Sequence, residues 1–220
     1  MKYIKLPSRK SNAFTLVEMV GVLAVIGILT AMLIPKVFET INTARINAAV
    51  AAVTTVKNAV ASHYAKYGGF ANADGELLTP ASVDADTDAA NFDELVLLND
   101  SMLEKAFAVK IGDQVTTTNK VVIRKIEAAA DATAIDEESA SYDLDGTGAI
   151  ETNDGALLCE CVITGVSAAD AYALKVAIDG ADLIAAETIA VGDAATAGRV
   201  KYPAIGAGAT GEVHVYVNHM

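Results

Sequence analysis

Residues Phe14–Pro35, FTLVEMVGVLAVIGILTAMLIP, form an apolar run in which Glu18 is the only charged residue. As an α-helix the run would be roughly 33 Å long, about the thickness of the hydrocarbon core of a bilayer. Residues 1–11 before it carry four basic residues and no acid, which places the N-terminus in the cytoplasm by the positive-inside rule. The run therefore predicts a helix that enters a membrane.

Glu18 distinguishes this run from an ordinary membrane segment. A secretory signal peptide would have a shorter apolar stretch followed by a small-residue cleavage site, and no A-x-A pattern follows here. A plain anchor fits the length, but an acid at the centre of such a helix costs about 2.5–3.5 kcal/mol, and less near its end. We therefore expect Glu18 to have a partner, the alternative being that its carboxylate reaches back to the lipid headgroups.

The stretch Ala13-Phe14-Thr15-Leu16-Val17-Glu18 resembles the processing site of type IV pilins and of the pseudopilins of type II secretion. The resemblance implies that a prepilin peptidase removes residues 1–13 in the cytoplasm, cuts between Ala13 and Phe14, and methylates the new Phe14 amine. Glu18 matches the acid of that family, and Pro35 matches a proline near the outer end of the apolar block. Ala13 departs from the pattern, since glycine usually precedes the cut.

The resemblance further implies assembly into a filament through this helix. The new ammonium group of Phe14 would lie in an apolar core, where Glu18 of a neighbouring subunit could pair with it, because opposite charges attract strongly where water is excluded. Pro35 lacks an amide donor and is expected to kink or locally melt the helix. Gly21 and Gly27 allow close approach of another helix.

The next segment, residues 36–67, continues the helical pattern to Gly68 and Gly69, which are typical of a helix end. One helix over residues 14–67 would be roughly 80 Å long. His63 lies on or beside the expected buried stripe and is interpreted as a packed residue. That stripe comprises Val37, Ile41, Ala44, Ala48, Ala52, Val56, Val60, His63 or Tyr64, and Tyr67.

Residues 68–220 are expected to form a globular acidic head, which gives four segments: the leader 1–13, the membrane or filament-core helix 14–35, the amphipathic stem 36–67 and the head. The formal net charge is −12, and loss of the leader would make it more negative. An acidic head beside a basic stem fits either complementary contacts between subunits or a solvated surface. Without a basic cluster beyond the leader, nucleic-acid binding is not indicated.

Patterns in the head predict an α+β fold, a long helix followed by mostly antiparallel strands, which agrees with the fold of the pilin family. Ser167 with Asp170 three residues later is typical of a helix N-cap, and the helix should end at Gly180. The expected elements are a helix over 92–108, a strand over 120–126, and two strands over 199–202 and 213–217 that could pair as a hairpin.

One run in the head follows the spacing of an EF-hand-like calcium loop. Its oxygen ligands would be Asp143, Asp145, Thr147, the Ala149 carbonyl, Glu151 and Asp154. Thr147 and Asp154 are weaker ligands than usual at their positions, and the alternative is a hairpin turned at Asp145-Gly146. Pilins and major pseudopilins bind calcium in their heads, which favours a stabilising role for the ion.

Cys159 and Cys161 are two residues apart, so a disulfide between them would be strained and would close almost no loop. We expect free, buried thiols. The chain carries no G-x-S-x-G, P-loop, H-E-x-x-H or G-x-G-x-x-G pattern, so an enzyme is not expected.

Three functions remain open from the sequence. The first is a precursor subunit of an extracellular pilus-like filament, which would need the peptidase, an inner-membrane assembly platform and self-association. The second is the major pseudopilin of a periplasmic pseudopilus. The third is a membrane-anchored, calcium-dependent binding module that does not polymerise.

Overall fold

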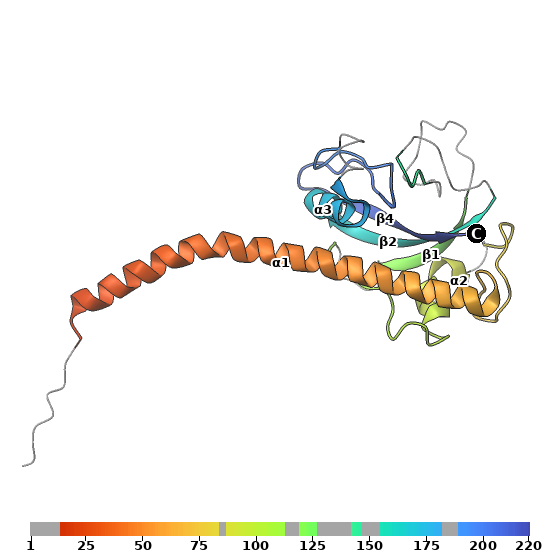
Figure 1. Ribbon diagram of the computed structural model, residues 1–220, viewed down its shortest axis with the longest axis horizontal. Helices are drawn as coiled ribbons and strands as arrows, with labels where there is room; N and C mark the ends of the chain where they lie inside the picture. The colour runs from red at the N-terminus through yellow and green to blue at the C-terminus, as the bar shows by residue number, and fades with distance from the viewer. Residues whose placement is uncertain (1–13, 84–86, 113–118, 127–141, 147–154, 182–188) are drawn as a thin grey trace, which may run out of the picture. The chain divides into compact units, whose positions relative to one another are not determined.

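The computed structural model describes residues 14–83, 87–112, 119–126, 142–146, 155–181 and 189–220. The chain forms two compact units, one ending at Thr43 and the other running from Ala44 to Met220. Helix α1 (Leu16–Tyr67) runs through both, drawn from red to yellow in Figure 1.

Helix α1 has 52 residues and confirms the long helix predicted from the sequence. It continues without interruption through Pro35, so the local melting considered above is wrong. A proline removes only one backbone donor, and the other hydrogen bonds of so long a helix keep it formed. At the other end Gly68, with φ of +78°, donates its amide to Tyr64 O at 2.8 Å, which confirms the predicted C-terminus.

The buried face of α1 differs by one helical row from the predicted stripe. The prediction is confirmed at Val56, Val60 and His63, but Ala44 and Ala48 are exposed. This stretch is rich in alanine and valine all round, so its periodicity cannot select between adjacent rows, and the packing of the second unit makes the choice. The buried residues are Ile46, Ala49, Val53, Val56, Ala59, Val60 and His63.

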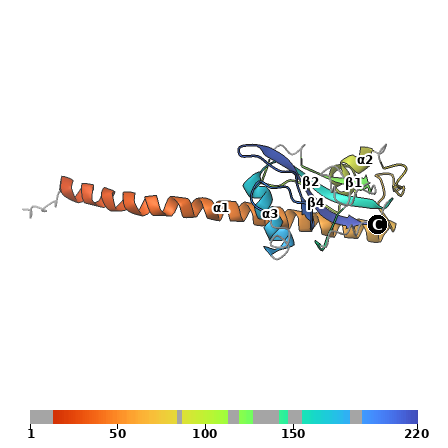
Figure 2. The ribbon, with the colours of Figure 1, turned by 90° about the horizontal axis from the view of Figure 1, so that it is seen from above.

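Four antiparallel strands form the sheet of the second unit, in the order β1-β2-β4-β3. Strands β1 (Lys120–Lys125) and β4 (Thr210–His219) flank the central strand β2 (Leu157–Ser167), and β3 (Val200–Lys201) pairs with β4. Figures 1 and 2 show β2 and β4 side by side. Strand β1 and the β3–β4 pairing confirm the sequence predictions, whereas β2 was not predicted.

The helices of the head correct one prediction and confirm another. Residues 92–108 do not form one helix: α2 (Thr87–Ala90) is followed by a single π-helical turn, η1 (Asp93–Leu97). The chain leaves the helix because the Asp93 carboxylate accepts hydrogen bonds from Phe107 N at 2.7 Å and Val121 N at 2.9 Å. Helix α3 (Ala168–Asp179) begins at the predicted cap, with Ser167 Oγ accepting from Asp170 N, and ends at Gly180.

The core lies between the second half of α1 and one face of the sheet. Cys159, Cys161, Val213 and Val215 from β2 and β4 belong to the same buried cluster as Val56 and Val60 of α1. A long N-terminal helix packed on a four-strand antiparallel sheet is an α+β fold, as the sequence predicted.

Candidate functional site at the start of helix α1

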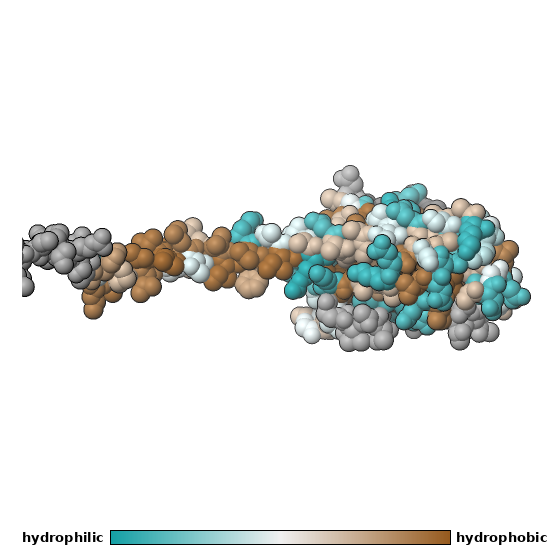
Figure 3. Space-filling view, turned by 90° about the horizontal axis from the view of Figure 1, so that it is seen from below, coloured by the Kyte–Doolittle hydropathy of each residue, from teal (hydrophilic) through white to brown (hydrophobic). Residues whose placement is uncertain are grey.

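Every large apolar side chain in the first half of α1 is exposed. The exposed fraction of every large apolar side chain from Phe14 to Ile41 lies between 41% for Ile41 and 80% for Leu16. Figure 3 shows these apolar residues following one another along the first unit. Soluble monomers rarely expose a contiguous apolar surface of this extent, so the segment requires a lipid or protein partner.

Two hydrogen bonds hold the Glu18 carboxylate at the start of the helix. Its Oε2 accepts from Thr15 N at 2.9 Å and from Thr15 Oγ1 at 2.8 Å, and Glu18 N donates to Thr15 Oγ1 at 3.3 Å. Thr15 O accepts the first helical bond, from Met19 N. This reciprocal arrangement is a capping box, with Thr15 at the N-cap and Glu18 three residues on.

The cap explains how the chain tolerates an acid in an apolar segment. The carboxylate satisfies a backbone donor that the helix itself leaves unpaired, and it lies at the positive end of the helix dipole. The T-x-x-E spacing was present in the sequence, but the sequence interpretation did not use it. Phe14 lies outside the helix with 79% of its surface exposed; Ala13 falls outside the described residues.

Gly21 and Gly27 have room for a side chain among the residues that the structure describes. A Cβ built at either position meets nothing within 4 Å there, yet glycine inside a helix is about 1 kcal/mol less favourable than alanine. No contact among the described residues therefore explains the two glycines, whereas a second helix packed closely against them would.

By length and composition α1 qualifies as a membrane-spanning helix, and none of the window that qualifies is buried within the protein. An α+β protein whose first helix begins with a capped, exposed apolar segment after a basic stretch is pilin-like. The family comparison agrees: residues 8–34 match the prokaryotic N-terminal methylation motif. The chain thus carries the prepilin-type cleavage and methylation segment, which is typical of type IV pilins and pseudopilins.

Proteins with this arrangement are typically structural and non-enzymatic. Comparison with curated proteins found no match, and comparison with solved structures found none.

The calcium prediction falls partly outside the described residues. Thr147, Ala149, Glu151 and Asp154 lie outside them, so only Asp143 and Asp145 can be located. Asp143 is buried, and its Oδ1 accepts from Gly146 N at 2.9 Å in a turn where Gly146 has φ of +75°. Asp145 is exposed. A carboxylate folded over its own turn suits the first position of an ion-binding loop and suits an ordinary turn equally well, so calcium stays a prediction.

The two cysteines are free and buried on the core face of β2, as predicted. Burial raises the pKa of both thiols well above the usual value. They are therefore packed as small apolar groups and carry little thiolate, the reactive form.

A buried ionic cluster on the opposite face of the sheet was not predicted. Glu160 on β2 has no exposed surface, and its Oε1 lies 3.0 Å from His214 Nδ1 and 3.2 Å from Arg124 Nε. Burial alone would raise the pKa of Glu160, but the hydrogen bond and charge of His214, with Arg124 and Lys201, lower it to about 2. Through the contacts of Glu160 with Arg124 and His214, the cluster joins β1, β2 and β4.

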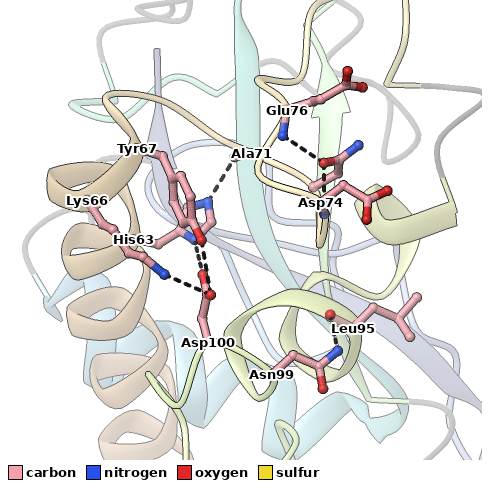
Figure 4. A network of polar contacts seen from close by, with 10 residues as sticks. His63, Lys66, Tyr67, Ala71, Asp74, Glu76, Leu95, Asn99 and Asp100 are labelled. Carbon is pink, nitrogen blue, oxygen red and sulfur yellow. Dashed lines mark hydrogen bonds and ion pairs between the residues drawn. The ribbon is translucent and has the colours of Figure 1, made fainter.

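A second polar cluster lies where α1 ends, and Figure 4 shows its side chains. Asp100 receives hydrogen bonds from Lys66 Nζ at 2.9 Å and Tyr67 Oη at 3.1 Å, and its Oδ2 lies 3.4 Å from His63 Nδ1. Lys66, one of the bases of the stem, thus pairs with an acid of its own chain. Asp93 and Asp100 thus bind groups of their own chain, whereas the sequence left the acids of the head to contacts between subunits or to a solvated surface.

A groove of about 330 Å³ lies between α1 and residues 102–108. Ala52, Val56 and Phe107 contribute to its mainly apolar lining, and its charged lining residues, Glu104 and Lys105, are exposed. The groove offers apolar contact area, with no buried acid or base among its lining residues.

Proposed function

We propose that this chain is the precursor of a structural subunit that is cut between Ala13 and Phe14 and polymerises through helix α1 into a pilus-like filament. Before assembly the precursor lies in the inner membrane of a bacterial cell, with its basic leader in the cytoplasm. An assembly platform in that membrane then transfers the processed subunit to the filament at the cell surface.

The observation that carries the proposal is the exposed apolar surface of residues 14–41. Transfer of apolar surface out of water is worth about 25 cal/mol per Å², so this segment must be covered by lipid or by other copies. At positions 21 and 27 a Cβ would meet no atom of the described residues within 4 Å, so these glycines favour a closely packed helix as the final neighbour. A bundle of α1 segments from many copies meets both requirements.

Glu18 gives the bundle a register. Hydrolysis of the Ala13–Phe14 bond leaves an ammonium group on Phe14, four residues before the carboxylate. Inside an apolar bundle this charge needs a negative partner, and the capped carboxylate is placed at the same end of the helix. A Glu18 from the neighbouring copy supplies that partner at one axial position only, so copies stack with a constant offset.

Intact mass of the protein isolated from its host tests the processing step. The expected species begins at Phe14 and carries one methyl group. A protein that still begins at Met1 would refute the proposal at its first step.

Assembly is tested by comparing Glu18→Gln with Glu39→Gln in sheared surface material. Glu18→Gln keeps the shape and the capping acceptor but loses the charge, and we expect no fibres. Glu39, which is exposed and pairs only with Lys36 at 2.8 Å among the described contacts, is the control, and its variant should assemble. Normal fibres from Glu18→Gln would show that the charge pair is not needed.

The motif is typical of pilins and pseudopilins alike, so a deletion strain separates the two forms of assembly. Loss of surface fibres identifies a pilus subunit. Retained fibres, with secreted enzymes held in the periplasm, identify the pseudopilus alternative.

A further inference from the structure

His63 joins three segments of the second unit. It lies in the last turns of α1 and is fully buried. Its Nε2 accepts the amide hydrogen of Ala71 at 3.0 Å, and its Nδ1 faces Asp100. Residues 69–78 fold back after the helix through an Ala71–Leu77 bridge and a 2.7 Å bond from Leu78 N to Phe70 O. The imidazole therefore links this loop to the helix by a side-chain hydrogen bond.

The hydrogen bonds define which nitrogen carries the proton. A backbone amide can only donate, so Nε2 must present its lone pair to Ala71. The neutral ring then carries its hydrogen on Nδ1, toward Asp100 Oδ2 at 3.4 Å. This is the tautomer that the donors around the ring require.

A second proton cannot enter the ring without breaking this arrangement. An imidazolium donates from both nitrogens and accepts at neither, so Nε2–H and the Ala71 amide would face each other as two donors. Ala71 has no exposed surface, and its amide would be left without an acceptor. Protonation of His63 thus breaks the hydrogen bond between Ala71 and the helix.

The groups around the ring shift the pKa of His63 in both directions. Burial lowers the pKa of His63, Asp100 opposes this with its negative charge and its contact with Nδ1, and Lys66 adds to the lowering. The rings of Tyr67 and Phe92 contact the imidazole with centroids at 4.7 and 5.0 Å. The net direction is downward, so the folded head holds His63 neutral at pH values where the free side chain is protonated.

We propose that His63 is an acid-sensitive joint: when it takes up a proton, residues 69–78 detach from the end of α1 while the sheet stays folded. Detachment would expose Phe70, whose surface is fully buried in the closed form. The end of the head therefore has a closed form near neutral pH and an open form in acid. This inference rests on the second unit alone and does not depend on the proposed filament.

Hydrogen exchange of the full-length protein in detergent tests the joint. Exchange is followed by mass spectrometry between pH 7.5 and 5.0, corrected for the intrinsic rate, in a peptide covering residues 69–78 and a reference peptide covering β2. Below about pH 6.5 protection of the 69–78 peptide should fall by up to about tenfold per pH unit, the slope for uptake of one proton. Protection of the β2 peptide should not follow this slope.

Three variants make the test specific. His63→Gln offers an amide oxygen to Ala71 but does not titrate, so the slope should disappear. His219→Gln removes a histidine elsewhere in the head, and the pH slope of the 69–78 peptide should remain. Asp100 is held by Lys66 and Tyr67 of α1 and so still faces the ring when the loop has detached. Asp100→Asn removes the charge that favours the protonated ring in this open form, so the onset should move to lower pH.

The proposal is overturned if protection of residues 69–78 in the wild type is independent of pH. It is also overturned if the slope persists in His63→Gln or if β2 loses protection in parallel. Should His63→Gln fail to fold, the onset in Asp100→Asn decides: an unchanged onset contradicts the joint.

Discussion

Tyr142 Oη donates a hydrogen bond to Glu160 Oε2 at 2.8 Å, and both side chains are fully buried. Through this contact the segment around residue 142 is attached to the central strand. Lys201 Nζ lies 4.5 Å from the centre of the Tyr142 ring, so the phenol also faces a buried cation. The Glu160 carboxylate is thus the common partner of Tyr142, Arg124 and His214 on this face.

We therefore predict that Glu160→Gln destabilises the head by about 3 kcal/mol, since it removes the negative charge that faces Arg124 and the buried Lys201 ammonium. The variant protein, in detergent, would be compared with the wild type by urea unfolding. Glu212→Gln is the matched control, because that exposed carboxylate lies 3.7 Å from His214 Nε2 and exposed pairs contribute about 0–1 kcal/mol. Equal losses in the two variants would contradict the assigned role of Glu160.

The low pKa of Glu160 predicts how the free energy of unfolding depends on pH. The folded pKa of about 2 lies below the ordinary value of 4.5, so the contribution of Glu160 is fully present above pH 4.5. It is lost as the pH falls from 4.5 to 2, by about 3 kcal/mol in all. Unfolding free energies measured across this range should show a steeper acid loss for the wild type than for Glu160→Gln.

Lys175 and Asp179 are expected to behave as a coupled pair. Their side chains are 0% and 2% exposed, and Asp179 also accepts from Arg199 N at 2.8 Å and Val200 N at 3.1 Å. Lys175 Nζ donates to the carbonyls of Ala197 and Val200. Asp179→Ala should cost about 3–5 kcal/mol, because a buried ammonium loses its counter-ion.

A double-mutant cycle measures that coupling. Lys175→Met combined with Asp179→Ala should cost less than the sum of the two single variants, because the second change removes the charge that the first left unpaired. Strict additivity of the unfolding free energies would rule out a coupled pair.

The Asp93 carboxylate accepts two backbone hydrogen bonds, so an amide in its place tests the loss of one acceptor. Its two carboxylate oxygens serve the amides of Phe107 and Val121. Asp93→Asn offers one oxygen and one NH₂ group, so one buried amide loses its acceptor at a cost of about 1–3 kcal/mol. Thermal unfolding should show the loss, and Glu94→Gln, at the exposed neighbouring position, should be close to neutral.

Calcium remains a testable prediction for residues 143–154. If the run binds calcium, a chelator lowers the Tm of the protein, because an ion that binds only the folded state stabilises it. Asp143→Asn keeps an acceptor for Gly146 N but loses the ligand charge, so it should lose the chelator effect without losing the turn. A Tm that does not respond to chelator in the wild type would identify an ordinary turn.

The sequence predicted those features that local patterns encode. The length of α1 follows from its apolar run and its glycine end, and the cap of α3 follows from Ser167 and Asp170. The T-x-x-E cap of α1 was equally local and could have been found. Strand β2 was missed because Glu160 and Gly165 interrupt its apolar pattern, and the helix expected over residues 92–108 was wrong because Asp93 binds amides remote from it.

By itself the sequence determined the long apolar helix, its processing motif and the cap of α3, since each depends on residues that are neighbours along the chain. Only the tertiary structure decided which row of α1 is buried and which acids are structural. It also decided that His63 meets Ala71 and Asp100. These properties depend on groups far apart in the chain, whose meeting is set by how the sheet packs against the helix.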